Sequence, residues 1–191
     1  MTIADFSASE LGAGYRAREL SPVEAAQAAL DRIAARDEAV NAFCLVDADA
    51  AVADARAAEA RFGRGEPLGP LDGVPVAVKD LLVTRGWPTL RGSRAIDPSG
   101  PWDDDAPAVA ALRRAGAVLP GKTTTPELGW KGVTDSALTG ITRNPWDVAR
   151  TAGGSSGGSA AALAAAWFRS RSARTAAARS GSRARSAGCP A

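Results

Sequence analysis

The stretch Thr151-Ala-Gly-Gly-Ser-Ser-Gly-Gly-Ser-Ala-Ala-Ala162 decides how the rest of the chain is interpreted. Glycine and serine fill every position from Gly153 to Ser159, and an alanine-rich run typical of a helix follows. A backbone needs this much glycine where φ is positive or where another group approaches closely. Serine hydroxyls and open N–H groups in front of a helix suit nucleophile and anion chemistry. A flexible linker has the same composition, so the other segments must distinguish the two interpretations.

The sequence contains no histidine, and this excludes several kinds of catalytic site. A Ser-His-Asp triad, a Cys-His dyad and any zinc site with histidine ligands are ruled out. The two cysteines, Cys44 and Cys189, lie far apart, which argues against a disulfide framework or a metal site and fits a reducing cytoplasm. We therefore expect no metal, no organic cofactor and a cytoplasmic location. No apolar run is long enough to span a membrane.

Helical and strand patterns alternate along the chain, which favours an α/β fold. The expected helices are residues 6–18, 22–35, 48–62, 105–115 and 159–167, and the expected strands are residues 41–46, 74–78 and 117–120. Ser21 is a natural N-cap, and Pro22 suits the first position of the helix behind it. Asp47 is expected to cap a third helix, and Asp105 or one of its neighbours is expected to cap a fourth.

Lys79 directly follows the strand pattern Val-Ala-Val. Burial at a strand end lowers the pKa of an amine and makes it a usable base, although a solvated lysine is the plainer alternative. Lys122 follows a second strand in the same way, so position alone does not single out Lys79. Without histidine, Ser155 or Ser156 could be activated only by a lysine, directly or through another serine. Ser159 is interpreted as a helix cap or a small packing residue.

Five blocks occur in order: Gly73-Val-Pro-Val-Ala-Val-Lys-Asp80, Gly116-Ala-Val-Leu-Pro-Gly-Lys-Thr-Thr-Thr-Pro-Glu127, Gly129-Trp-Lys-Gly-Val-Thr-Asp135, Arg143-Asn-Pro-Trp-Asp147 and Gly153-Gly-Ser-Ser-Gly-Gly-Ser-Ala-Ala-Ala162. Together they resemble the amidase signature family, from about Ala8 to Ala165. The resemblance implies a large mixed sheet with helices on both faces, of which residues 1–165 would form the N-terminal part of the domain. It also implies hydrolysis of an amide C–N bond in a small-molecule substrate, as in simple amidases and the A subunits of tRNA-dependent amidotransferases.

The family uses a Ser–cis-Ser–Lys triad, and the resemblance carries two of its members onto this chain. Lys79 matches the base, and Ser155 matches the bridging serine, whose preceding peptide bond is cis. The supporting loop would be Gly153, Gly154, Ser156, Gly157 and Gly158. The nucleophilic serine of the family lies in a Gly-Gly-Gly-Ser-Ile-Arg-Ile-Pro segment, and its spacing from Ser155 leads here to Arg179. No serine nucleophile is therefore in frame.

A shifted reading frame accounts for this break. Back-translation of Ala166–Arg183 with G+C-rich codons, read from the third base, gives Met-Val-Pro-Leu-Ala-Leu-Gly-Thr-Asp-Gly-Gly-Gly-Ser-Ile-Arg-Ile-Pro, which is the missing family segment. We expect that an insertion or deletion of one or two bases near Ala165–Ala166 destroyed the frame. Residues 166–191 would then be a basic, disordered tail, and the chain a truncated fragment without amidase activity.

Two alternatives remain. Residues 169–191 contain six arginines and no acidic residue, a composition that could bind nucleic acid. The frame shift explains the same arginines, which makes nucleic-acid binding the weaker interpretation. An intact enzyme that uses Ser180 or Ser182 with Lys79 ranks lowest, because the residues around these serines differ from the family segment. The sequence does not indicate an oligomeric state.

Overall fold

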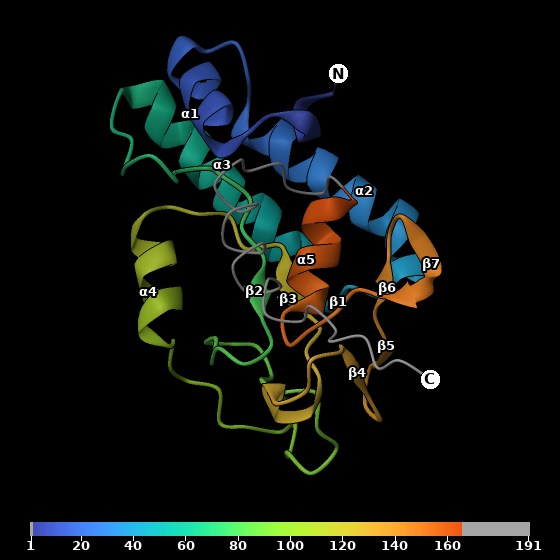
Figure 1. Cartoon of the computed structure of the whole chain (residues 1–191). Coiled ribbons are helices and arrows are strands. Elements are labelled where there is room, and N and C mark those ends of the chain that lie inside the picture. The colour runs from blue at the N-terminus through green and yellow to red at the C-terminus, as the bar shows by residue number, and fades with distance from the viewer. Residues whose placement is uncertain (1, 166–191) are drawn as a thin grey trace.

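The computed structural model describes residues 2–165 (Figure 1). The helices are α1 (Ala8–Ala17), α2 (Pro22–Val40), α3 (Ala48–Arg64), α4 (Pro107–Arg114) and α5 (Gly157–Ala164), with 3₁₀ turns η1 (Ile3–Asp5) and η2 (Glu127–Gly129). The strands are β1 (Phe43–Val46), β2 (Val78–Lys79), β3 (Gly121–Thr123), β4 (Asp135–Ser136), β5 (Gly140–Ile141), β6 (Arg143–Asn144) and β7 (Asp147–Thr151). Within this part of the chain, no helix combines the length and the apolar character needed to cross a membrane.

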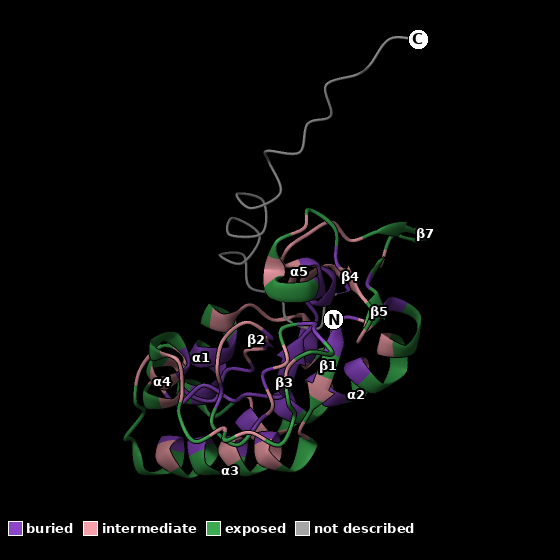
Figure 2. Cartoon of the chain, turned by 90° about the horizontal axis from the view of Figure 1, so that it is seen from below, coloured by how far each residue is buried: buried purple, intermediate pink, exposed green. Residues whose placement is uncertain are grey.

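A mixed three-stranded sheet lies at the centre of the molecule and confirms the predicted α/β class. β3 is the middle strand, antiparallel to β1 and parallel to β2. In Figure 2, α5 lies on one side of this sheet and α3 on the other. Apolar side chains from both layers pack onto the sheet: Ala161 and Ala162 of α5 pack with Phe43, while Ala51 and Ala55 of α3 pack with Val118.

The predicted helix starts are confirmed where a side chain caps the backbone. Ser21 accepts hydrogen bonds from the N–H groups of Val23 and Glu24 at the start of α2, and Asp47 accepts one from Ala50 at the start of α3. Each cap satisfies N–H groups that a helix leaves without a partner. The second helix runs to Val40, beyond the predicted end, and stops where Asn41 adopts a left-handed conformation with φ 55°.

The predicted strands 74–78 and 117–120 are wrong in extent. β2 contains only Val78 and Lys79, and β3 begins after Pro120. The two segments do run side by side, since the N–H of Val76 donates to the carbonyl of Val118 at 2.8 Å. Pro75 and Pro120 interrupt the regular ladder because proline has no N–H to donate. Sequence periodicity therefore located the two extended segments but not the part of each that forms a regular strand.

Two helix starts also differ from prediction. α4 begins at Pro107 with Ala106, a neighbour of Asp105, as its N-cap residue, and the carboxylate of Asp105 accepts the N–H of Arg85 and forms an ion pair with Arg113. α5 begins at Gly157, two positions before Ser159, with Ser156 as its N-cap residue. The hydroxyl of Ser159 lies 2.7 Å from that of Thr123 in β3, so Ser159 is a packing residue and does not open the helix.

Candidate active site

The structure brings Lys79 and the glycine–serine loop together across 76 residues of chain. The Lys79 Nζ atom donates hydrogen bonds to Ser155 Oγ at 3.0 Å and to Ser156 Oγ at 2.9 Å. Lys79 is placed by β2, whose parallel pairing sets it opposite Thr123 of β3. The serines are placed by α5, which starts immediately after them and packs on both strands. An amine and two hydroxyl groups therefore meet where a strand ends and a helix begins.

Two threonine hydroxyls hold the loop in position. The hydroxyl of Thr134 donates to the carbonyl oxygen of Gly153 at 2.8 Å and accepts the N–H of Gly157 at 2.9 Å. Thr125 Oγ1 donates to the carbonyl oxygen of Ser155 at 3.3 Å. The Gly154–Ser155 peptide bond between these anchors is cis. Neither threonine was predicted from the sequence, although the run Thr123–Thr125 at the end of β3 was a signal for Thr125.

The glycines of the loop serve two different physical needs. Gly153 has φ 79° with open space around its Cα, so its need is conformational. A Cβ on Gly154 would lie 2.7 Å from the carbonyl carbon of Val133, and one on Gly158 would lie 2.6 Å from the amide nitrogen of Thr124. At Gly157 an added Cβ would meet the Thr134 hydroxyl. Close packing therefore requires glycine at these three positions.

We expect Gly158→Ala to lower the free energy of unfolding by about 1–3 kcal/mol, because the added methyl overpacks rigid backbone atoms. Gly63→Ala is the matched control: Gly63 lies in α3 with no neighbouring atom within 4 Å of the position that a methyl group would take, and alanine favours helix by roughly 0.5–1 kcal/mol. Urea unfolding followed by circular dichroism measures both. Equal free energies of unfolding for the two variants would contradict this prediction, because the loop would then accommodate the methyl group without loss of stability.

The two lysines that the sequence could not separate differ in their partners, although desolvation lowers the pKa of both. Lys79 is half-buried, desolvation lowers its pKa, and within residues 2–165 it forms no ion pair. Lys122 is fully buried, and its Nζ lies 2.9 Å from a carboxylate oxygen of Asp80 and 3.0 Å from the carbonyl oxygen of Pro88. Asp80 also accepts the N–H of Gly92. Lys122 therefore has a structural ion pair, whereas Lys79 has none in the described part of the chain.

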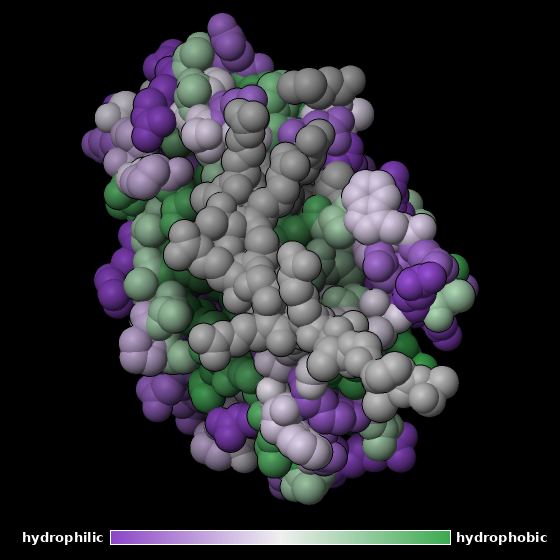
Figure 3. Space-filling model, in the orientation of Figure 1, coloured by the Kyte–Doolittle hydropathy of each residue, from purple (hydrophilic) through white to green (hydrophobic). Residues whose placement is uncertain are grey.

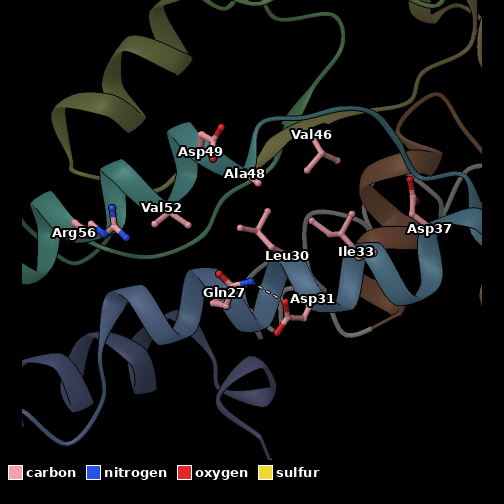
Figure 4. Close-up of a pocket in the computed structure, with 11 residues that line it drawn as sticks. Gln27, Leu30, Asp31, Ile33, Asp37, Val46, Ala48, Asp49, Val52 and Arg56 are labelled. Carbon is pink, nitrogen blue, oxygen red and sulfur yellow. Dashed lines mark hydrogen bonds between the residues drawn. The ribbon is translucent and has the colours of Figure 1, made fainter.

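A groove elsewhere on the surface lacks the lysine and serine side chains that meet at the candidate site. A groove between α2 and α3 has an apolar floor that includes Leu30 and Val52 and a rim that includes Asp31 and Asp49 (Figure 4). Neither a lysine nor a serine lines it.

Among residues 2–165, no cluster of cysteine and carboxylate side chains could hold a metal ion. The predictions for Arg179, Ser180, Ser182 and the rest of the basic tail lie outside the described residues.

Comparisons with known proteins identify the family of the chain. The family model described as Amidase matches residues 24–169. The A subunit of glutamyl-tRNA(Gln) amidotransferase from Acidothermus cellulolyticus is 52% identical over 159 residues, which cover 83% of this chain and 31% of that protein. Its counterpart from Salinispora arenicola is 52% identical over 164 residues, covering 85% of this chain and 33% of that protein.

Solved structures are similar over the same region. A chain from a vestigial protein complex, described as revealing the evolutionary origins of an s-triazine catabolic enzyme, has a TM-score of 0.82 and 40% identity over 85% of this chain and 36% of its own. Native peptide amidase from Stenotrophomonas maltophilia has a TM-score of 0.78 and 35% identity over 85% of this chain and 34% of its own. The chain thus spans about a third of the length of its relatives. It belongs to the amidase family, of whose domain it covers the N-terminal portion.

Proposed function

We propose that Lys79 and Ser155 are the base and the bridging serine of an amide-hydrolysing Ser–cis-Ser–Lys site, and that residues 1–191 lack its nucleophile. The observation that carries the proposal is the 3.0 Å contact between Lys79 Nζ and Ser155 Oγ, at a lysine that has no ion pair in the described part of the chain. Gly153, Gly154, Ser156, Gly157 and Gly158 support this pair as its loop.

The proposed chemistry follows from the order of these groups. Neutral Lys79 accepts the proton of Ser155, and Ser155 takes the proton of the nucleophilic serine as that oxygen attacks the amide carbonyl. The protonated base then returns the proton to the leaving amine, and water releases the acyl group by the same path. A lowered pKa of Lys79 serves this role, because only the neutral amine accepts a proton.

A frame shift at Ala165–Ala166, with the basic tail as its product, explains the missing nucleophile in this proposal. The sequence has Arg179 where the family spacing requires serine. Back-translation with G+C-rich codons, read in the offset frame from Ala166, gives a serine triplet at that point. Sequencing the DNA around Ala166 tests the idea, which fails if the true codons do not encode Gly-Gly-Gly-Ser-Ile-Arg-Ile-Pro in the offset frame. A cytoplasmic location and a small-molecule amide substrate belong to the same proposal.

We expect purified residues 1–191 to show no turnover of a simple aryl amide above the buffer rate, because little beyond binding remains once a triad loses its nucleophile. The assay is release of the aryl amine, with Ser155→Ala as the matched comparison. Turnover that is lost in Ser155→Ala would contradict the proposal. Labelling of Ser180 or Ser182 by a fluorophosphonate probe would instead support the alternative in which one of these serines replaces the missing nucleophile.

Nucleic-acid binding is the second candidate function, favoured only by the six arginines and no acids after position 168. If the arginines are a product of the shifted frame, the chain should not retard RNA at physiological salt. A gel shift that weakens steeply with salt and disappears on deletion of residues 169–191 would support this candidate.

A further inference from the structure

Thr134 joins the two ends of the glycine–serine loop through a single hydroxyl group. Its Oγ1 atom donates to the carbonyl oxygen of Gly153 at 2.8 Å and accepts the N–H of Gly157 at 2.9 Å. The two serines that contact Lys79 lie in the chain between these anchor points. A hydroxyl group has one proton to donate, so its donor is fully used on this loop.

The start of α5 relies on Thr134, because the N-cap residue of this helix does not cap it with its own side chain. A helix leaves its first four N–H groups without internal partners, and the N-cap side chain usually accepts one of them. The side chain of Ser156 accepts none. Its hydroxyl instead accepts a hydrogen bond from Lys79 Nζ at 2.9 Å. Thr134 accepts the first N–H of α5, that of Gly157, while the hydroxyl of Ser156 is directed to Lys79.

The segment that carries Thr134 is itself held in place. The N–H of Thr142 donates to the carbonyl oxygen of Thr134 at 2.9 Å, directly beyond the β4–β5 pairing. The backbone of Val133 lies so close to Gly154 that a Cβ there would be 2.7 Å from its carbonyl carbon. Figures 1 and 2 both place β4 close to α5. The hydroxyl of Thr134 is therefore a fixed point against which the loop can be positioned.

Thr134 is buried, which makes its two hydrogen bonds hard to replace. Hydrophilic and hydrophobic residues lie side by side on the surface around β6 and β7 (Figure 3), whereas Thr134 is 1% exposed. A buried donor or acceptor that loses its partner retains the full cost of its desolvation. Without the hydroxyl, the carbonyl of Gly153 and the N–H of Gly157 lose their partner, and the loop must move to find others.

We propose that Thr134 is a positioning residue of the candidate site: its hydroxyl holds the loop so that Ser155 and Ser156 lie within hydrogen-bond distance of Lys79. The inference rests on the proposed function, in which Lys79 and Ser155 are the base and the bridging serine. Both hydrogen bonds of the Thr134 hydroxyl reach the loop backbone, so Thr134 acts through the loop. Thr125 contributes less, because it holds the loop at one point and at 3.3 Å.

The test uses residues 1–191 and needs no catalysis. The sequence contains three lysines, Lys79, Lys122 and Lys131, so NMR of the chain labelled with ¹³C at lysine Cε gives three signals, and Lys79→Arg identifies one of them. This signal should titrate below about 10.4, the ordinary pKa of lysine, because desolvation lowers the pKa of Lys79. In Thr134→Val the displaced loop admits water to the amine, and the pKa of Lys79 should rise toward that ordinary value.

Amide hydrogen exchange gives a second readout. The N–H of Gly157 loses its acceptor in Thr134→Val and should exchange at least about tenfold faster. Thr134→Ser keeps the hydroxyl and should restore both the slow exchange and the low pKa of Lys79. The matched control is Thr142→Val: Thr142 is 0% exposed, and its hydroxyl donates to the carbonyl of Asn41 at 2.7 Å, away from the loop. This variant should lose stability without a change in the pKa of Lys79.

Three results would overturn the positioning role: a Lys79 pKa unchanged in Thr134→Val, an equal change in Thr142→Val, or no recovery in Thr134→Ser. Circular dichroism establishes that each variant is folded. If Thr134→Val does not fold, Gly157→Ala takes its place, because the added methyl group would meet the Thr134 hydroxyl and separate it from the loop. The same rise in the pKa of Lys79 is then expected, and an unchanged pKa again overturns the proposal.

Activity in a frame-restored chain separates this role from the proposed function. Thr134→Val should lower kcat by about 10²-fold with little change in KM, since misplacing a reacting group by about 1 Å costs that much. An unchanged kcat would overturn the role of Thr134 in the reaction. Amide turnover that survives Lys79→Ala would instead overturn the proposed base, and the NMR titration of residues 1–191 would still decide whether Thr134 positions the loop.

Discussion

In a gene whose reading frame is restored at Ala166, Lys79→Ala is expected to lower kcat/KM for amide hydrolysis by at least about 10⁴-fold. Lys79 Nζ contacts both Ser155 and Ser156, and no other lysine in the described part of the chain donates a hydrogen bond to either serine. Without that amine, Ser155 has no base to take its proton. Hydrolysis of an aryl amide by the restored enzyme and its variant measures the effect.

Lys131→Met is the matched control for this prediction. Lys131 lies on the partly exposed segment before β4 and pairs with Asp135, so its loss should change kcat/KM by less than about threefold. The pH profile gives a second readout. Because the base must be neutral, activity should rise with pH through the lowered pKa of Lys79 and fall away below it. A Lys79→Ala enzyme within tenfold of the unsubstituted one would assign the base to another group.

The parts of the fold that local chemistry determines could be predicted from the sequence. Ser21 and Asp47 cap helices because each side chain reaches N–H groups only two or three residues away. The strand limits could not be predicted in the same way. Val74–Val78 alternates like a strand, yet Pro75 removes a donor, and the regular ladder is confined to Val78 and Lys79.

The candidate site could be predicted only in part. Periodicity placed Lys79 and Lys122 alike at strand ends, and the distinction depends on Asp80, whose side chain pairs with Lys122 across parallel strands. Such a contact between residues far apart in the chain leaves no pattern in a single sequence. The pairing of Lys79 with Ser155 came from the family resemblance, and no spacing rule would have given it. Thr125 and Thr134 were missed for the same reason, since their partners lie in a distant loop.

Asp80→Asn is expected to lower the free energy of unfolding by about 3–5 kcal/mol, the cost of removing one partner of a buried ion pair. The side chain of Lys122 is 0% exposed and that of Asp80 is 4% exposed. Without the carboxylate, the ammonium keeps the carbonyl of Pro88 and the hydroxyl of Thr89 as hydrogen-bond acceptors, and neither carries a charge. Urea unfolding followed by circular dichroism measures the loss in the free energy of unfolding. A variant that is already unfolded without urea would have lost at least the upper value of this range.

Two further variants isolate the effect of the buried charge. Lys122→Met combined with Asp80→Asn removes both charges, and it should recover much of the stability because an apolar chain of similar length then fills the site. Glu66→Gln breaks the exposed Arg64–Glu66 pair, whose side chains are 59% and 65% exposed, and should change stability by less than about 0.5 kcal/mol. If Asp80→Asn is as mild as Glu66→Gln, the pair does not hold β2 and β3 together. A large loss of stability that the double variant reverses would instead show that the carboxylate of Asp80 compensates the buried charge of Lys122. Lys79, the residue before Asp80, has no carboxylate partner in the described part of the chain, which is what the proposed base requires.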